Sequence, residues 1–137
     1  MPNVECEQIY RRAFGDAFPY PQIIEQFRAF FSDYNREHTL PHKPGLMDCL
    51  NGLTARGVKI ALATSTVRPL VLEYFTTMPE VAVHFDAIVC GGEVPHGKPA
   101  PDIYLAAARA VGCEPADCVG VEDSLSGVRA IRGAGAH

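Results

Sequence analysis

The feature that most constrains the fold is an alternation of short apolar runs with helical patterns from residue 41 to residue 137. The apolar runs are residues 58–63, 87–90 and 118–121, and the helical patterns lie at 46–53, at 101–111 and from Leu125 onward. Runs that are apolar on both faces and separated by helices indicate parallel strands buried between two layers of helix. The sequence therefore predicts an α/β fold with a Rossmann-like parallel sheet and flanking helices.

Residues 1–40 have a different pattern and predict a separate helical module. Apolar residues recur at helical spacing over residues 21–38, and an earlier helix is expected over residues 4–14. No strand pattern accompanies these helices, and a proline-rich break at residues 40–45 separates them from the rest of the chain. We therefore expect two domains, residues 1–40 and residues 41–137.

Composition and charge exclude several classes of function. The formal net charge of −4 and the lack of a lysine or arginine cluster argue against nucleic acid and against an anionic membrane as partners. No apolar run approaches the length of a membrane span, and residues 1–6 lack the pattern of a secretory leader, so a cytoplasmic location is expected. The cysteines are scattered and form no C-x-x-C pair, which argues against a zinc site and against a disulfide framework.

Polar residues follow each predicted strand, and the carboxyl ends of parallel strands form the ligand-binding edge of a sheet. Thr64 and Ser65 follow the first strand, where hydroxyl and N–H groups at the start of a helix suit a phosphate. Lys98 follows the second strand in a stiff loop rich in glycine and proline, and its charge suits a phosphoryl group. Glu122 and Asp123 follow the third strand, where carboxylate oxygens suit Mg²⁺.

Each of these signals also has a plainer interpretation. Thr66 could cap the helix before Pro69, Lys98 could be a solvated surface lysine, and Asp123 or Ser124 could cap the helix that follows them. Three successive strand ends nevertheless carry a phosphate cradle, a cation and a metal-binding acid. Together they favour phosphoryl transfer.

The loop before Lys98 also matches the spacing G-x-x-x-x-G-K of a nucleotide-binding P-loop. The next position argues against that interpretation. Pro99 has neither the hydroxyl that would reach Mg²⁺ nor the N–H that a phosphate cradle uses. A nucleoside triphosphatase is therefore not expected.

Three stretches of the α/β region resemble the second, third and fourth motifs of haloacid dehalogenase-like phosphatases, in the branch that contains β-phosphoglucomutase. They are residues 60–65 (IALATS), 97–102 (GKPAPD) and 120–127 (GVEDSLSG), in the order of the family. Residues 1–40 are similar to the later part of the helical cap that this branch inserts after its first strand. The resemblance implies a Mg²⁺-dependent phosphatase or phosphomutase that acts on a small phosphorylated metabolite, such as a sugar phosphate.

The resemblance also implies roles for the residues that bind the phosphoryl group. Thr64 would bind the transferring group through its hydroxyl, with the backbone N–H of Ser65 assisting. Lys98 would balance the phosphoryl charge and order the nucleophile. Arg68, one helical turn beyond the cradle, would contact the substrate, although an exposed helix arginine explains that residue equally well.

The cofactor implied by the resemblance is Mg²⁺. Asp123, together with Glu122, would hold the metal ion. Both residues belong to the stretch that resembles the fourth motif. Magnesium bound by one or two carboxylates, water and phosphate oxygens is the usual arrangement in phosphoryl-transfer sites.

The family's first motif is missing from this chain. In the family an apolar strand ends in Asp-x-Asp, whose first aspartate attacks phosphorus and whose second acts as general acid and base. No aspartate in this sequence is followed by another aspartate two residues later. The strand that carries the motif would lie in the middle of the sheet, between residues 58–63 and 118–121, and a C-terminal strand of the family is also missing. The exposed strand edges should then invite aggregation or pairing with another chain.

The missing motif leaves three hypotheses. In the first, the chain is a truncated phosphatase or phosphomutase that is inactive alone and prone to aggregate. In the second, it is a non-catalytic module that binds phosphate or a protein partner through Thr64, Lys98 and Asp123, which predicts a stably folded, monodisperse chain. In the third, a second polypeptide completes the sheet, and the chain is recovered in a stoichiometric complex.

Overall fold

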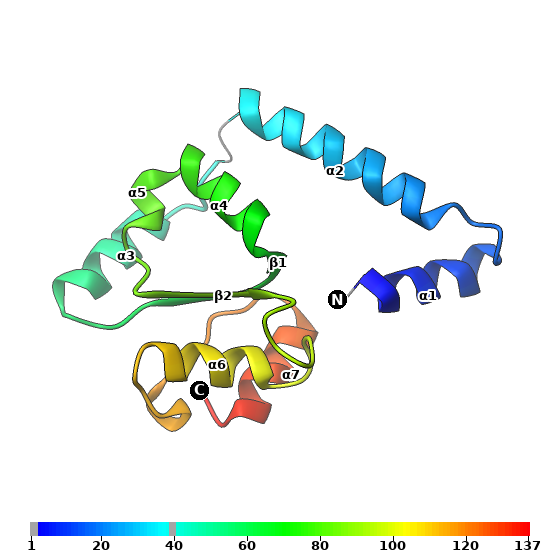
Figure 1. The fold of residues 1–137 in the computed structure, drawn as a ribbon. Coiled ribbons are helices and arrows are strands. Elements are labelled where there is room, and N and C mark those ends of the chain that lie inside the picture. The colour runs from blue at the N-terminus through cyan, green and yellow to red at the C-terminus, as the bar shows by residue number, and fades with distance from the viewer. Residues whose placement is uncertain (1–2, 39–40) are drawn as a thin grey trace. The chain divides into compact units, whose positions relative to one another are not determined.

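The computed structural model describes residues 3–38 and 41–137 (Figure 1), and its contacts divide the chain into two compact units, one up to Pro41 and one from His42 onward. The first unit contains two helices, α1 (Asn3–Phe14) and α2 (Tyr20–Glu37). Across the two described ranges, no helix is both long enough and apolar enough to cross a bilayer.

Aromatic contacts hold the first unit together. The ring centroid of Tyr10, on α1, lies 5.5 Å from that of Phe18 and 5.6 Å from that of Tyr20, at the start of α2. Tyr20 is only 5% exposed, so it anchors one helix against the other. The chain turns between the helices at Gly15, whose φ of +90° favours glycine. Both helices expected from the sequence of this region are present.

The second unit is an α/β fold built on two parallel strands. Its elements are α3 (Leu46–Ala55), β1 (Ala61–Val67), α4 (Arg68–Thr77), α5 (Pro79–Ala82), β2 (Ala87–Gly91), α6 (Asp102–Ala110), a 3-10 turn (Pro115–Asp117) and α7 (Leu125–Ala134). Ala61 pairs with Ala87 and Ala63 pairs with Val89. Helices α3, α4 and α5 lie on one side of the strands, and α6 and α7 on the other (Figure 1). The predicted α/β class, with a parallel sheet and flanking helices, is confirmed.

The core of the second unit lies between β2 and α6. Val89 of β2 and Ile103 and Ala107 of α6 form its buried centre. Cys90, which follows Val89 in β2, is fully buried. Burial of these side chains fixes α6 against the sheet. The loop from the end of β2 to the start of α6 is thereby held at the carboxyl end of the strands.

The first strand starts later than predicted. The sequence predicts a strand over residues 58–63, whereas β1 begins at Ala61. The backbone of Ile60 bonds to Asp86 instead, because its N–H donates to the Asp86 carboxylate at 2.9 Å and its carbonyl accepts the Asp86 N–H at 2.8 Å. Lys59 adds an ion pair to the same carboxylate at 2.7 Å. One backbone bond thus remains between the two segments at this end of β1, and the Asp86 side chain replaces the other.

The first strand also ends later than predicted. Residues 64–66, expected at the start of a helix, are extended within β1, and Val67 pairs with Gly91. Pro69 lies in the first turn of α4, where its fixed φ suits the helix start, and the helix begins at Arg68. The threonines before it are β-branched and favour extended backbone. The predicted placement of Thr64 and Ser65 at a helix start, and the plainer interpretation of Thr66 as the cap of that helix, are therefore wrong.

The predicted third strand is also wrong. Residues 118–121 belong to no strand. Their backbone bonds to the last residue instead, because Gly120 N–H donates to the carbonyl of His137 at 2.7 Å and His137 N–H donates to Cys118 at 3.0 Å. A strand requires a neighbouring strand to pair with. In the described part of the chain, β1 pairs with β2 alone.

The segment 118–121 is therefore extended but poorly covered. Val119 is 79% exposed and Val121 is 94% exposed. Such apolar side chains next to unpaired backbone groups form the kind of surface that associates with another strand. The exposure of these two valines fits the exposed strand edge expected from the missing first motif.

We predict that Gly91→Ala destabilises the second unit. A Cβ at Gly91, in β2, would overlap the backbone carbonyl oxygen of Ser65 in β1. Overpacking of this kind costs about 1–3 kcal/mol. The midpoint of thermal unfolding and the yield of soluble protein should both fall.

Gly133→Ala is the matched control. A Cβ at Gly133, on α7, would lie 3.5 Å from Pro101, an ordinary contact, and alanine favours a helix over glycine by about 1 kcal/mol. This variant should unfold at the same temperature or slightly higher. Equal midpoints for Gly91→Ala and the unmodified chain would contradict the close approach of the two strands.

Candidate functional site

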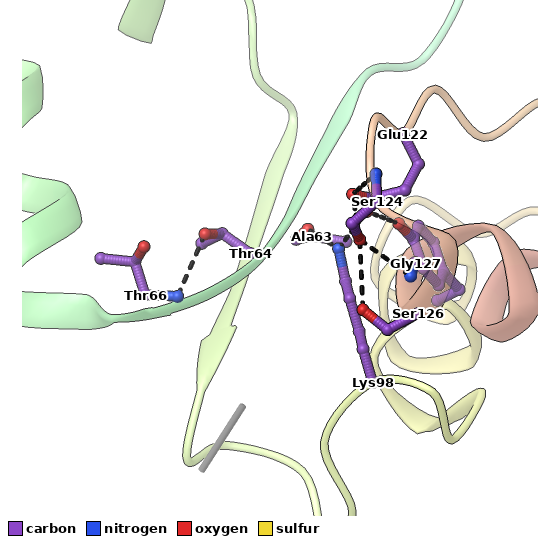
Figure 2. Close-up of polar contacts among 9 residues, drawn as sticks. Ala63, Thr64, Thr66, Lys98, Glu122, Ser124, Ser126 and Gly127 are labelled. Atoms are coloured by element: carbon purple, nitrogen blue, oxygen red, sulfur yellow. Dashed lines mark hydrogen bonds and ion pairs between the residues drawn. The ribbon is translucent and has the colours of Figure 1, made fainter. Parts of the chain in front are cut away.

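The centre of the candidate site is a nearly buried ion pair at the carboxyl end of the strands (Figure 2). Lys98 Nζ lies 2.5 Å from Glu122 Oε2, and the two side chains are only 10% and 11% exposed. The same ammonium donates to the carbonyl oxygen of Ala63 in β1 at 3.2 Å. The pair therefore joins β1, the loop before α6 and the segment that leads into α7.

The carboxylate of Glu122 accepts hydrogen bonds at both oxygens. Oε2 accepts from Lys98 and from the hydroxyl of Tyr104 at 2.7 Å. Oε1 accepts from the backbone N–H of Ser124 at 3.2 Å and from the Ser124 hydroxyl at 3.0 Å. Ser124 Oγ also accepts the N–H of Gly127, which caps α7. Ser124 is thus the helix cap, as one of the plainer interpretations proposed.

Gly127 allows this arrangement because it has no side chain. A Cβ at Gly127 would overlap the Glu122 carboxylate. The first turn of α7 therefore packs directly against the acid. The partial positive charge of a helix N-terminus favours a carboxylate at this position.

Hydrogen bonding outweighs burial in the electrostatics of this pair. Burial favours the protonated form of Glu122, but the hydrogen bonds from Lys98, Tyr104 and Ser124 stabilise the carboxylate and lower its pKa to about 2. Burial likewise opposes the charge of Lys98, but its hydrogen bond to Glu122 and the nearby Tyr104 oxygen raise the pKa of Lys98 above its usual value. Both groups are charged at neutral pH.

Thr64 and Ser65 lie next to this pair in the sequence, but their side chains do not join it. The hydroxyl oxygen of Thr64 accepts the backbone N–H of Thr66 at 3.1 Å. In Figure 2 the Thr64 side chain points toward Thr66 and away from Lys98. Both residues lie inside β1. The phosphate-binding roles expected for them stay predictions.

Arg68 is engaged in an ion pair of its own. Its guanidinium donates to Glu93 at 2.5 and 2.9 Å and to the carbonyl oxygen of Ile88 at 2.8 Å. The Glu93 carboxylate also accepts the N–H of Cys90 at 2.9 Å. These contacts tie the first residue of α4 to β2. The expected contact of Arg68 with substrate stays a prediction.

The described residues supply one carboxylate for a metal ion at this edge of the sheet. Asp123 is exposed and, within the described residues, makes no hydrogen bond or ion pair. Both oxygens of Glu122 are already engaged by four donors. No group of three or more His, Cys, Asp or Glu side chains in residues 3–38 and 41–137 is placed to hold a metal ion. The Asp123 carboxylate is therefore available to Mg²⁺, whereas the Glu122 oxygens are already occupied, and the roles of both residues as metal ligands stay predictions.

Sequence reasoning missed Tyr104, in this site, and Glu93, the partner of Arg68. Tyr104 and Glu93 carry no motif signal in a single sequence, because each acts through a partner that only the fold brings close. The loop that carries Lys98 could have indicated a contact with Tyr104. The helix after this loop begins at Asp102, so its first turn lies close to Lys98 in the sequence.

Comparison with known proteins places the chain in one family, through a match over most of its length. The family model described as haloacid dehalogenase-like hydrolase matches residues 6–135. A phosphorylated carbohydrates phosphatase of Thermotoga maritima is 34% identical over 114 residues, which cover 83% of this chain and 50% of that protein. The chain spans about half the length of the curated relatives it matches.

Solved structures share the fold. CbbY from Rhodobacter sphaeroides, in complex with phosphate, has a TM-score of 0.75 and 32% identity, covering 88% of this chain and 54% of that chain. β-Phosphoglucomutase from Clostridium difficile has a TM-score of 0.82 at 21% identity, covering 98% of this chain and 61% of that chain, which is a likeness of fold alone.

We predict that Glu122→Gln removes part of the acid sensitivity of the second unit. The pKa of Glu122 is about 2 in the folded chain, against 4.5 for an ordinary glutamate, so its stabilising effect is complete above pH 4.5 and lost as the pH falls toward 2. This fall corresponds to roughly 3 kcal/mol, because a tenfold change in an ionisation constant is worth about 1.4 kcal/mol. Urea unfolding at several pH values between 7 and 2.5 should show a flatter profile for the variant.

Glu114→Gln is the control for this experiment, because Glu114 is an exposed carboxylate of the same unit. Its profile should follow that of the unmodified chain. Parallel profiles for Glu122→Gln and the unmodified chain would show that the carboxylate is not held by its four donors.

Proposed function

Because the chain belongs to the haloacid dehalogenase-like hydrolase family, in its β-phosphoglucomutase-like branch, we propose that its second unit forms part of the phosphoryl-transfer site of a phosphatase or phosphomutase. The substrate class we propose is a small phosphorylated metabolite such as a sugar phosphate. The observation that carries this proposal is Lys98, whose ammonium is held charged at the carboxyl end of the strands by Glu122. The phosphorylated carbohydrates phosphatase among its relatives supports the substrate class.

Lys98 would supply the positive charge for the phosphoryl group. An ammonium has three N–H groups, and two of them donate to Glu122 and to the Ala63 carbonyl. The third remains for a phosphoryl oxygen. Because the side chain is nearly buried, its charge is weakly screened and acts strongly on a bound anion.

Asp123 would hold Mg²⁺, together with water and phosphoryl oxygens. When bound, the metal ion supplies charge neutralisation for the transferring group. Thr64, through its hydroxyl, and Ser65, through its backbone N–H, would assist from within β1 when the substrate is in place. Glu122 is assigned to Lys98 and not to the metal ion, because its oxygens have no free acceptor position.

The nucleophile and the remaining metal ligands would come from a segment outside these 137 residues. No Asp-x-Asp pair occurs in the sequence, and β1 has one edge without a strand partner within the described residues. A strand ending in Asp-x-Asp beside β1, from a longer polypeptide or a second chain, would bring both carboxylates to the end that carries Lys98. A cytoplasmic location is part of this proposal.

The alternative function is a non-catalytic module that binds phosphate or a protein partner. The lack of an aspartate nucleophile in the sequence favours it. Lys98 and Asp123 would then bind an anion and a cation without turnover. Activity and association state separate the two functions.

We predict that the 137-residue chain alone releases no phosphate from a sugar phosphate, because it has no carboxylate to form the covalent intermediate. Extension by its natural upstream coding sequence, or mixing with a chain that ends a strand in Asp-x-Asp, should produce Mg²⁺-dependent release. Asp123→Ala should abolish that release, whereas Asp117→Ala, at an exposed aspartate outside the site, should retain it. Mg²⁺-dependent turnover by the chain alone, lost in Asp123→Ala, would contradict the proposal.

We predict that Val121→Lys reduces self-association of the chain. Val121 is 94% exposed in the unpaired segment, and a lysine at a strand edge discourages pairing with another strand. Sedimentation velocity should show a smaller fraction of fast-sedimenting oligomers and aggregates for this variant. Val83→Lys is the matched control, because Val83 is 78% exposed but follows α5, and it should behave like the unmodified chain. A monodisperse unmodified chain would favour the non-catalytic module.

A further inference from the structure

Tyr104 contacts both members of the ion pair at the centre of the site. Its hydroxyl donates to Glu122 Oε2 at 2.7 Å, the same oxygen that accepts Lys98 Nζ at 2.5 Å. The Lys98 ammonium also lies over its ring, with Nζ 4.9 Å from the ring centroid. The Tyr104 side chain therefore contacts the Lys98 ammonium with its ring face and the Glu122 carboxylate with its hydroxyl.

The backbone holds Tyr104 firmly in this place. It lies in the first turn of α6, immediately after the proline-rich loop that carries Lys98. Its ring packs against the buried cluster that Val89 and Ile103 help to form. Packing against this cluster restricts the ring and, with it, the position of the hydroxyl.

The three contacts around the Lys98 ammonium limit the directions it can face. A carboxylate oxygen of Glu122, the carbonyl oxygen of Ala63 and the ring face of Tyr104 each occupy one side. A cation over an aromatic face is attracted to it, but the ring accepts no conventional hydrogen bond. The ammonium thus has two conventional acceptors among the described residues, and its third N–H has only the ring face beside it.

We propose that Tyr104 is a positioning residue for Lys98, which keeps one N–H of the ammonium directed toward a bound phosphoryl oxygen. This inference rests on the function proposed above. The hydroxyl shares Oε2 with Lys98, so Oε2 has no acceptor position left for a second N–H of the ammonium. Without the hydroxyl, Lys98 is the one remaining donor to Oε2, and the third N–H of Lys98 can fold back onto that oxygen.

The role of the hydroxyl can be separated from that of the ring. Tyr104→Phe removes the donor and keeps the ring, whereas Tyr104→Leu removes both. Tyr10→Phe, which removes a hydroxyl in the other compact unit, is the matched control. Lys98→Met identifies which NMR signals belong to the Lys98 ammonium, because those signals are absent from its spectrum.

The test measures two quantities on the full chain. Nitrogen-15 NMR reports the hydrogen exchange rate of the Lys98 ammonium, and titration with inorganic phosphate reports anion affinity. In Tyr104→Phe we expect ammonium exchange about tenfold faster and phosphate affinity about tenfold weaker, the scale of one hydrogen bond to a charged group. Tyr10→Phe should match the unmodified chain in both.

The outcomes separate this inference from the proposed function. Unchanged Lys98 exchange in Tyr104→Phe overturns the positioning role, even if the unfolding temperature falls, because a merely structural role moves only stability. Faster exchange combined with weaker phosphate binding supports it. If the unmodified chain binds no phosphate but exchange still accelerates in the variant, Tyr104 positions Lys98 and the proposed function is wrong for this chain.

Discussion

Lys98 and Glu122 place an ammonium and a carboxylate within 2.5 Å of each other, each about one-tenth exposed. Charges buried to this extent remain only when they are paired and hydrogen-bonded, because removing one partner leaves an unpaired charge that costs about 3–5 kcal/mol. The pair therefore acts as a constraint on the chain. Through the Ala63 carbonyl it holds β1, the loop before α6 and the segment before α7 at one point.

This constraint explains why the candidate site is ordered although the sheet around it has two strands. Residues 118–121 pair with no strand, and their valines are exposed. Glu122 follows them directly, and it stays at the sheet edge because Lys98 and Tyr104 hold it there. A two-stranded sheet alone is marginal, so helix packing and this ion pair carry the arrangement.

The site as described contains a cation and its support, but only one available carboxylate. Lys98 is charged and is held by Glu122 and the Ala63 carbonyl, and Asp123 is exposed at the same edge. The hydroxyl of Thr64 bonds within its own strand, and the sequence holds no Asp-x-Asp pair. These features fit a phosphoryl-transfer site in which the attacking group and further metal ligands belong to a segment beside β1, and that is the arrangement we propose.

The sequence by itself determined the elements that depend on local patterns. Helical spacing predicted α1, α2 and α6, alternation of strands and helices predicted the α/β class, and the proline-rich loop placed Lys98 after β2. Tertiary structure decided what depends on distant partners. Residues 118–121 look like a strand but are not one, because a strand exists only beside a neighbour. The sequence predicts Glu122 as a metal ligand, whereas in the structure its carboxylate binds the Lys98 ammonium. The fold brings together these two charges, which are 24 residues apart in the sequence. Local sequence sets the preference of the backbone, whereas the pairing of buried polar groups is set by which segments meet.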